Sequence, residues 1–172
     1  GHVNVLELLV NLGADVYSVD SKKRTALHSC CAYRQRPEFE KNAMNLKSRV
    51  KSQLECLHYL CEVVPDMMDW GDEAGATALH FAADQGDADL LLALLQTAAD
   101  PNIRDGLDRT PHSIALRANH VSCAKILEQY GGGSGDGGGS TTPQRSPTQQ
   151  YQSHQSHQSH QSHQSHETHF LH

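Results

Sequence analysis

The sequence predicts an all-α repeat fold, and three observations lead to this prediction. Two residue strings recur along the first 130 positions, one of them with a period of 33 residues. Each copy of one string places a threonine where its hydroxyl would cap the start of a helix. Each copy of the other follows a Leu-Leu pair in a predicted helix. The chain has 172 residues, which suits one domain of ordinary size.

The first string is Thr-Ala-Leu-His, and it marks the start of three predicted helices. It begins at Thr25 and Thr77, and a variant, Thr-Pro-His-Ser, begins at Thr110. The second interval is 33 residues, and the first is 52, which is one period plus 19 inserted residues. Proline after the third threonine costs no hydrogen bond at a first helical position. An aspartate precedes each threonine by five positions, namely Asp20, Asp72 and Asp105.

The second string closes the predicted second helix of a repeat. It reads Gly13-Ala-Asp15-Val16 in one copy and Ala98-Ala-Asp100-Pro-Asn102 in another. A Leu-Leu pair precedes each copy, and Gly1-His2 and Gly86-Asp87 open the helices that carry these pairs. Gly13 and Gly86 are expected to adopt positive φ at helix ends.

These strings resemble the ankyrin repeat across residues 1–130, as half a repeat followed by three more. The resemblance implies antiparallel helix pairs with hairpin-like loops, stacked into a curved solenoid, and a protein-binding role without chemistry of its own. Stacking is needed because one helix pair cannot bury both of its faces. The sequence departs from the family at Ala26 and Ala78, which replace proline, and at His112-Ser113, which replaces Leu-His and weakens the loop anchoring of the last repeat.

The two ends of this 1–130 domain are expected to differ. The first half repeat has one predicted helix without a partner, so we expect it to pack on an upstream segment and the chain to be a piece of a longer protein. At the other end, polar residues face water and Gly131 ends the last helix.

The 19 extra residues form an insertion at about 33–51, between the two helices of the second repeat. Helical spacing predicts one long helix from Pro37 to about Val63. Its apolar face comprises Phe39, Ala43, Leu46, Val50, Leu54 and Leu57. Three roles stay open: a basic surface for an acidic partner or membrane, a cover for the neighbouring repeat, or a contact with the chain's own acidic block. The basic residues are Arg34, Arg36, Lys41, Lys47, Arg49 and Lys51.

Charge and hydropathy restrict the partners and the compartment. Residues 62–108 contain eleven acidic residues and a single basic one, Arg104. This block argues against nucleic acid as a partner of the body and favours a protein with a basic segment. No run of 18 apolar residues exists, so no membrane span is expected. Five cysteines, an odd number without Cys-x-x-Cys spacing, favour reduced thiols inside the cell, in the cytoplasm or alternatively the nucleus.

Loop tips and first-helix surfaces line the concave groove that the resemblance implies. The predicted tips are Ser21–Lys23, Trp70–Glu73 and Arg104–Asp108. Trp70, the only tryptophan, would anchor a basic peptide if exposed; alternatively, it packs against Met67 or Met68 under its own loop. Binding at such a groove should weaken with salt. The candidate partner-binding residues are Trp70, Asp72, Glu73, Phe81, Asp84, Gln85, Asp105, Asp108 and Arg117.

No residue pattern points to catalysis. The sequence has no Ser-His-Asp order, paired carboxylates, phosphate-binding glycine loop or His-Glu-x-x-His motif. In ankyrin repeats the histidine at the position of His28 and His80 bridges adjacent loops, so we expect a structural role for both, and also for the lone His58. We therefore expect no enzymatic activity and no cofactor.

The C-terminal residues are predicted to lack a packed core. Residues 131–150 are rich in Gly, Ser and Pro and suit a flexible linker, and residues 151–172 form a low-complexity His/Gln/Ser tail expected to be disordered. The histidines could bind Zn²⁺ or Cu²⁺ loosely, although a repeat without selected function explains them as well. They are His154, His157, His160, His163, His166, His169 and His172.

These features together predict a monomeric, non-enzymatic adaptor that holds a protein partner in its concave groove. One alternative is the ankyrin portion of a larger regulatory enzyme, such as a GTPase-activating protein. Another is the ankyrin portion of a transcriptional regulator, and a weaker one is metal buffering by the tail.

Overall fold

The computed structural model describes residues 2–32 and 43–133, with the backbone alone for residues 43–50. These residues fall in one compact unit, residues 1–137. The described part is helical, without strands, which confirms the all-α prediction. Its elements are α1 Val3–Asn11, α2 Ala26–Ala32, α3 Ala43–Val63, the 3-10 helix η2 Pro65–Met67, α4 Ala78–Gln85, α5 Ala88–Gln96, α6 Pro111–Arg117 and α7 Val121–Gln129.

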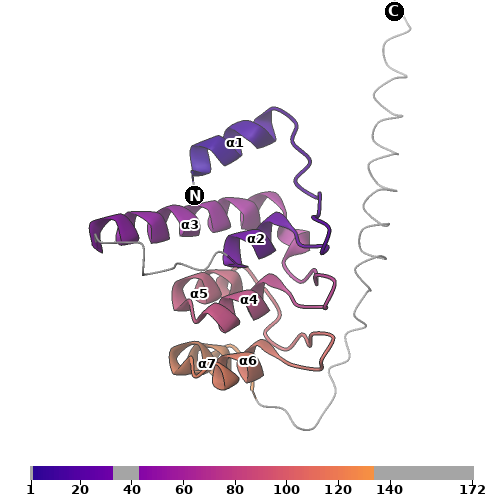
Figure 1. The fold of residues 1–172 in the computed structure, drawn as a ribbon, viewed down its shortest axis with the longest axis vertical. Helices are drawn as coiled ribbons and strands as arrows, with labels where there is room; N and C mark the ends of the chain where they lie inside the picture. Colours follow the sequence, from indigo (N-terminus) through magenta and orange to yellow (C-terminus); the bar gives the residue numbers. More distant parts are fainter. Residues whose placement is uncertain (1, 33–42, 134–172) are drawn as a thin grey trace, which may run out of the picture. The chain divides into compact units, whose positions relative to one another are not determined.

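The helices form two stacked layers. Helices α2, α4 and α6 stack as an inner layer, and each pairs with the outer helix that follows it, α3, α5 or α7. The loops before the inner helices extend from the same side of the stack (Figure 1). Helix α1 lies at one end and contacts α3. The stacked antiparallel helix pairs that the sequence predicted are therefore confirmed.

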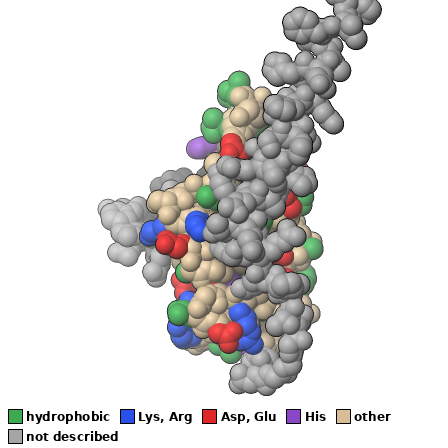
Figure 2. All heavy atoms as spheres, turned by 90° about the vertical axis from the view of Figure 1, so that its right-hand side faces the viewer, with side chains coloured by type: hydrophobic (Ala, Val, Ile, Leu, Met, Phe, Trp, Pro, Cys, Tyr) green, Lys and Arg blue, Asp and Glu red, His purple; other side chains and the backbone are tan. Residues whose placement is uncertain are grey.

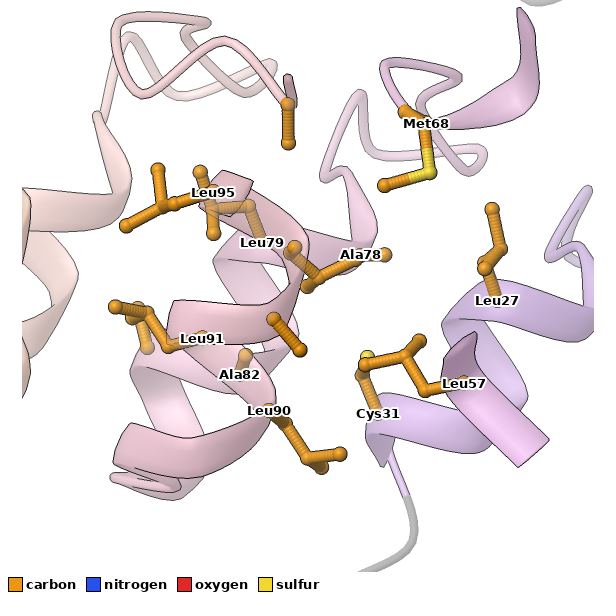
Figure 3. Packing of buried hydrophobic residues seen from close by; sticks show 14 of the residues in the cluster. Leu27, Cys31, Leu57, Met68, Ala78, Leu79, Ala82, Leu90, Leu91 and Leu95 are labelled. Carbon is orange, nitrogen blue, oxygen red and sulfur yellow. The ribbon is translucent and has the colours of Figure 1, made fainter. Parts of the chain in front are cut away.

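Leucines from both layers fill the core. Leu27 of α2, Leu57 of α3, Leu79 of α4 and Leu91 of α5 are almost fully buried in one cluster (Figure 3). Full burial of each side chain contributes about 1.5–3 kcal/mol relative to exposure. The core is continuous between repeats, so each pair depends on its neighbours for burial.

A glycine is required between α4 and α5. Gly86 has φ +73°, and a Cβ at this position would clash with the imidazole ring of His120. The turn is tied to the next repeat because Nε2 of His120 donates to the Asp84 carbonyl at 3.1 Å. The positive φ expected at Gly13 and Gly86 is confirmed.

The long inserted helix is confirmed over Ala43–Val63, and positions 37–42 of the prediction lie outside the described residues. With 21 residues, α3 is more than twice as long as any other helix of the described part. Its C-terminal part belongs to the stack, because Leu57 and Leu60 are buried and α3 contacts both α2 and α5. The Gln53 amide donates to the Cys30 carbonyl at 2.7 Å, which joins α3 to α2.

Candidate functional site

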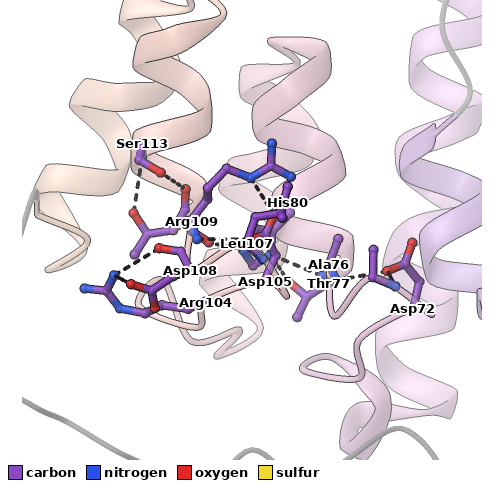
Figure 4. Close-up of polar contacts among 12 residues, drawn as sticks. Asp72, Ala76, Thr77, His80, Arg104, Asp105, Leu107, Asp108, Arg109 and Ser113 are labelled. Carbon is purple, nitrogen blue, oxygen red and sulfur yellow. Dashed lines mark hydrogen bonds and ion pairs between the residues drawn. The ribbon is translucent and has the colours of Figure 1, made fainter.

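The loop before α6 is organised by the carboxylate of Asp105. Its Oδ1 accepts the backbone N–H groups of Leu107 and Arg109, each at 2.9 Å (Figure 4). Its Oδ2 accepts Nε–H of Arg109 at 2.8 Å. Burial alone would raise the pKa of Asp105, but the hydrogen bonds from Arg109 outweigh this effect and hold the pKa below its usual range.

Asp72 has the same role in the preceding loop. Its Oδ1 accepts the N–H groups of Ala74 and Ala76 at 2.9 and 3.0 Å. Both aspartates are buried. The prediction that Asp72 and Asp105 present charge to a partner is therefore wrong, because both side chains are buried and Oδ1 of each accepts the backbone N–H groups two and four residues later.

Histidines join each loop to the next. Nε2 of His80 lies 3.0 Å from the Arg109 carbonyl, and its Nδ1 accepts the Thr77 N–H at 3.1 Å. Because the carbonyl can only accept, the proton is on Nε2 and the ring is neutral. Burial lowers the pKa of His80, which is consistent with this neutral form.

His28 repeats the arrangement between the first and second loops. Its Nε2 donates to the Ala76 carbonyl at 2.9 Å, and its Nδ1 accepts the Thr25 N–H at 3.1 Å. The ring also meets Phe81 edge to face, with centroids 5.6 Å apart. The expectation that both histidines bridge adjacent loops is confirmed. Within the described ranges, no three His, Cys, Asp or Glu side chains gather as metal ligands would.

Trp70 is buried, with 7% of its surface exposed, so the prediction of an exposed aromatic anchor is wrong. Its ring lies 6.5 Å from that of Tyr17, and it belongs to the same buried cluster as Met67 and Met68. The alternative, that Trp70 packs under its own loop, is the one that the structure supports. Trp70 follows the 3-10 helix η2, whose Met67 is also buried.

The remaining predicted residues lie at or near the surface. Glu73, Asp84, Asp108 and Arg117 are exposed, and Phe81 and Gln85 are half-buried. Asp108 pairs with Arg104 at 3.1 Å. No hydrogen bond to the carboxylates of Glu73 and Asp84 is recorded in the described part of the chain. The acidic surface is therefore smaller than its sequence suggests.

The structure adds one apolar residue to these tips that was not among the candidates. Leu107 is 71% exposed, although it lies between the buried Asp105 and the capped helix start. The predicted tip Arg104–Asp108 contained it, and an apolar residue flanked by Gly and Asp was the available signal. Lys22 and Lys23 are exposed on the first tip. We call the exposed loop residues Lys22, Lys23, Glu73 and Leu107, together with Asp84 near the end of α4, the tip surface.

Most of the predicted second basic surface lies outside the described residues. This applies to Arg34, Arg36 and Lys41, and to the side chains of Lys47 and Arg49. Lys51 is exposed and lies 3.8 Å from Glu55. The tail histidines from 154 to 172 also lie outside the described residues.

All five cysteines are free thiols. Four are buried, and Cys30 is half-buried. Burial is the main cause that raises the pKa of each thiol, to about 12 for Cys30. They have the burial expected of core cysteines.

A comparison with protein families matches residues 79–128 to the model for ankyrin repeats in many copies. The matched region runs from α4 to α7 and contains the Asp105 loop and the bridge from His80 to Arg109. Residues 79–128 thus match ankyrin repeats.

The curated relatives named here are much longer than this chain, which spans 15% of one and 2% of the other. Tyrosine-protein kinase HTK16 of Hydra vulgaris is 26% identical over 127 residues, which cover 74% of this chain and 15% of that protein. Neurogenic locus notch homolog protein 1 is 41% identical over 56 residues in both Xenopus laevis and Mus musculus. That match covers 33% of this chain and 2% of the relative. Within the described residues, no helix has the length and hydropathy to cross a membrane.

Proposed function

We propose that this ankyrin-repeat chain is a non-enzymatic module that binds a protein partner through its tip surface and the neighbouring faces of α4 and α6. The observation that carries the proposal is the contrast between buried and exposed side chains of the loops and the inner helices. Asp72, Asp105, His28 and His80 are buried and hydrogen-bonded within the stack, whereas Glu73, Asp84 and Leu107 project from it.

Such loops are suited to recognition because their geometry is set before the partner arrives. The bridges from His28 to Ala76 and from His80 to Arg109 tie successive loops together. Binding then orders little additional backbone, which keeps the entropic cost of association low. The exposed Leu107 supplies an apolar contact. The exposed carboxylates of Glu73 and Asp84 supply an electrostatic one.

The chemistry of these groups suits a protein segment that combines a basic residue with an apolar one. Glu73, in the loop before α4, or Asp84, near the C-terminal end of α4, would pair with the basic residue, and Leu107 would be buried by the apolar one. Because exposed charge pairs are screened by salt, the affinity should decrease as salt concentration rises.

The test compares partners captured from cell lysate by the full chain and by two charge-matched variants. The first variant combines Glu73→Lys with Asp84→Lys. The control combines Glu62→Lys with Asp89→Lys, which are exposed on the outer helices α3 and α5. Proteins retained by the parent and the control but lost by the first variant support the proposal. Equal retention by all three would refute it.

A second candidate is that the chain is the ankyrin portion of a larger signalling protein. The match to a tyrosine-protein kinase over 74% of this chain favours this candidate, because the matched segment is 15% of that kinase. A transcript that continues this reading frame into a kinase domain would support it. A longer protein that contains this chain but has no enzymatic domain would favour the simple adaptor or a transcriptional regulator.

We also infer that the protein works inside the cell, because its five cysteines are free thiols in a disulfide-free core. The cytoplasm is the expected compartment, with the nucleus as the alternative. Imaging of a tagged chain tests this, and secretion into the medium would contradict it.

A further inference from the structure

The loop before α6 contains an aspartate that is followed directly by a glycine, Asp105-Gly106. In such a pair the backbone nitrogen of the glycine can attack the carboxyl carbon of the aspartate, because glycine has no side chain to hinder the approach and its backbone is permissive. The sequence has one other Asp-Gly pair, Asp136-Gly137, which lies outside the described residues. In the other two loops, serine or glutamate follows the equivalent aspartate.

The fold requires both residues of the Asp105-Gly106 pair. The carboxylate of Asp105 accepts the backbone N–H groups that hold its loop. A Cβ at position 106 would clash with the carbonyl oxygen of Ala74 in the preceding loop. The stack thus keeps a chemically reactive pair in this loop, because the aspartate is needed and a side chain after it does not fit.

The closed loop protects the carboxyl group of Asp105 from attack. The side chain is only 1% exposed, and both of its oxygens accept hydrogen bonds (Figure 4). Burial alone would raise the pKa of Asp105, but the hydrogen bonds from Arg109 hold it below its usual range. The carboxyl group therefore stays ionised, and a carboxylate is a poorer electrophile than a carboxylic acid.

The closed loop also holds the attacking nitrogen. The N–H of Gly106 donates to the Ala74 carbonyl at 2.7 Å, which ties this amide to the preceding loop. A second tie lies beside it, because Nε2 of His80 donates to the Arg109 carbonyl at 3.0 Å. The nitrogen can turn toward the carboxyl carbon only when the loop before α6 separates from the loop before α4.

Exposure alone does not mark a reactive aspartate. Asp108 of the same loop is exposed and pairs with Arg104 at 3.1 Å, and Figure 2 shows both acidic and basic side chains at the α6–α7 end of the stack. However, Asp108 is followed by Arg109, whose side chain hinders attack by the backbone nitrogen. The reactive pair of this loop is thus the buried one, and its reaction depends on opening.

We propose that Asp105 is a modification site, which is converted to isoaspartate when the loop before α6 opens. The nitrogen of Gly106 forms a bond to Cγ of Asp105, and one carboxyl oxygen leaves as water with the amide proton and a second proton. Water then adds to the backbone carbonyl carbon of residue 105 in the resulting succinimide ring and breaks the bond from that carbon to the Gly106 nitrogen. The composition is unchanged, but the backbone now runs through Cβ and Cγ of residue 105.

The product no longer fits the closed loop. Its backbone is longer by one methylene group, and its free carboxylate is attached to Cα in place of Cβ. The N–H groups of Leu107 and Arg109 lose the acceptor that the closed loop gave them. The modification therefore makes opening of the last repeat permanent. This inference is independent of the tip surface and of the proposed partner binding.

The test follows isoaspartate at both Asp-Gly pairs of the full chain. The chain is incubated at neutral pH in buffer and in guanidinium, and peptide mapping with fragmentation measures conversion at each pair. Asp136-Gly137, for which the sequence predicts a flexible linker, is the internal reference. In guanidinium we expect both pairs to convert at similar rates. In buffer we expect Asp105 to convert at least about tenfold more slowly than Asp136, because reaction requires local opening.

A variant tests whether the tie to the preceding loop protects the pair. His80→Ala removes the hydrogen bond to the Arg109 carbonyl and should raise the rate at Asp105, relative to Asp136, several-fold in buffer. His58→Ala, at an exposed position of α3, is the control and should leave this ratio unchanged. If circular dichroism shows that His80→Ala does not fold, the comparison of buffer and guanidinium in the parent decides.

Three results would overturn the proposal. The first is the same ratio of the two rates in buffer and in guanidinium, which would show that the closed loop gives no protection. The second is absence of isoaspartate at Asp105 in guanidinium while Asp136 converts. The third concerns the consequence: after conversion in guanidinium and return to buffer, the α6 and α7 amides should exchange at least about tenfold faster than in the unconverted chain. Equal exchange would show that the loop closes despite the modification.

Discussion

Nε2 of His28 donates to the carbonyl oxygen of Ala76 at 2.9 Å, across 48 positions of the sequence. His80 makes the same bond to Arg109 in the next repeat. Two buried neutral histidines thus hold the loops in register, and the tip surface depends on that register. The predictions below test this arrangement and the roles assigned to its neighbours.

Loss of a bridging histidine should destabilise the fold. We expect His80→Ala to lower the free energy of unfolding by about 2–4 kcal/mol, because the buried Thr77 N–H loses its acceptor and the Arg109 carbonyl loses a donor. Urea unfolding followed by circular dichroism measures the change. The control is His58→Ala, an exposed position on α3, which should change the value by no more than about 0.5 kcal/mol. Equal effects would show that the bridge contributes nothing.

Stability should decrease as the pH falls. Burial lowers the pKa of both His28 and His80 below 6.5, so the unfolded chain takes up protons that the folded chain does not. The contribution of each neutral histidine to the free energy of unfolding is complete above pH 6.5. It decreases as the pH falls from 6.5 to the pKa that the histidine has in the folded state. Unfolding titrations between pH 8 and pH 5 measure the slope. The slope of the unfolding free energy against pH reports how many protons are taken up on unfolding. In His80→Gln this number should be smaller by up to one, and an unchanged slope would contradict the neutral assignment.

Asp105 should matter for folding more than for binding. Asp105→Ala leaves the N–H groups of Leu107 and Arg109 without their acceptor, which should cost about 1–3 kcal/mol of unfolding free energy. Glu73→Ala removes an exposed carboxylate and should change stability by no more than about 0.5 kcal/mol. Thermal melts of the two variants distinguish the roles. If Asp105→Ala has the same melting temperature as the parent, the aspartate is not needed to hold the loop.

Trp70 should report on the core and not on a partner. Its fluorescence should be blue-shifted in the native state and should move to longer wavelength on unfolding, because its ring leaves a buried site. Trp70→Ala should cost about 3–5 kcal/mol. Leu107→Ala, at an exposed tip, should cost no more than about 0.5 kcal/mol. Native emission at the unfolded wavelength would show that the ring is exposed.

The thiols should be slow to react in the folded protein. Burial raises the pKa of Cys30 to about 12 and raises the pKa of the other four thiols as well. The thiolate is the reactive form, so we expect labelling with a disulfide reagent at pH 8 to be at least about 100-fold slower than in urea. If Cys31 of α2 labels equally fast in both conditions, the packing of α2 on α3 would be contradicted.

Much of the fold could be predicted from sequence because its signals are local and repeated. The Thr-x-x-His strings locate α2 and α4, and a proline after Thr110 locates the start of α6. The apolar spacing predicted α3 over the part that is described.

The site was harder to predict because exposure depends on the path of the chain. Trp70 is the first residue of the predicted tip Trp70–Glu73, and nothing in its sequence neighbours shows that its ring is buried with Met67 and Met68. Counting charged residues does not distinguish Asp72 and Asp105 from exposed acidic residues. In the structure, however, their carboxylates accept backbone N–H groups. Their fixed spacing before each threonine was the available clue. Leu107 was not among the predicted binding residues, because an apolar residue in a loop is more often buried than exposed to solvent.

The central claim is that a partner binds the tip surface, and hydrogen exchange of the full chain with a captured partner tests it most directly. The account predicts slower exchange in the loops at residues 20–24, 72–76 and 105–109 and in α4 and α6. The outer helices α5 and α7 should be unchanged. Slower exchange confined to α3, α5 or α7 would place the partner on the opposite face and would contradict the account.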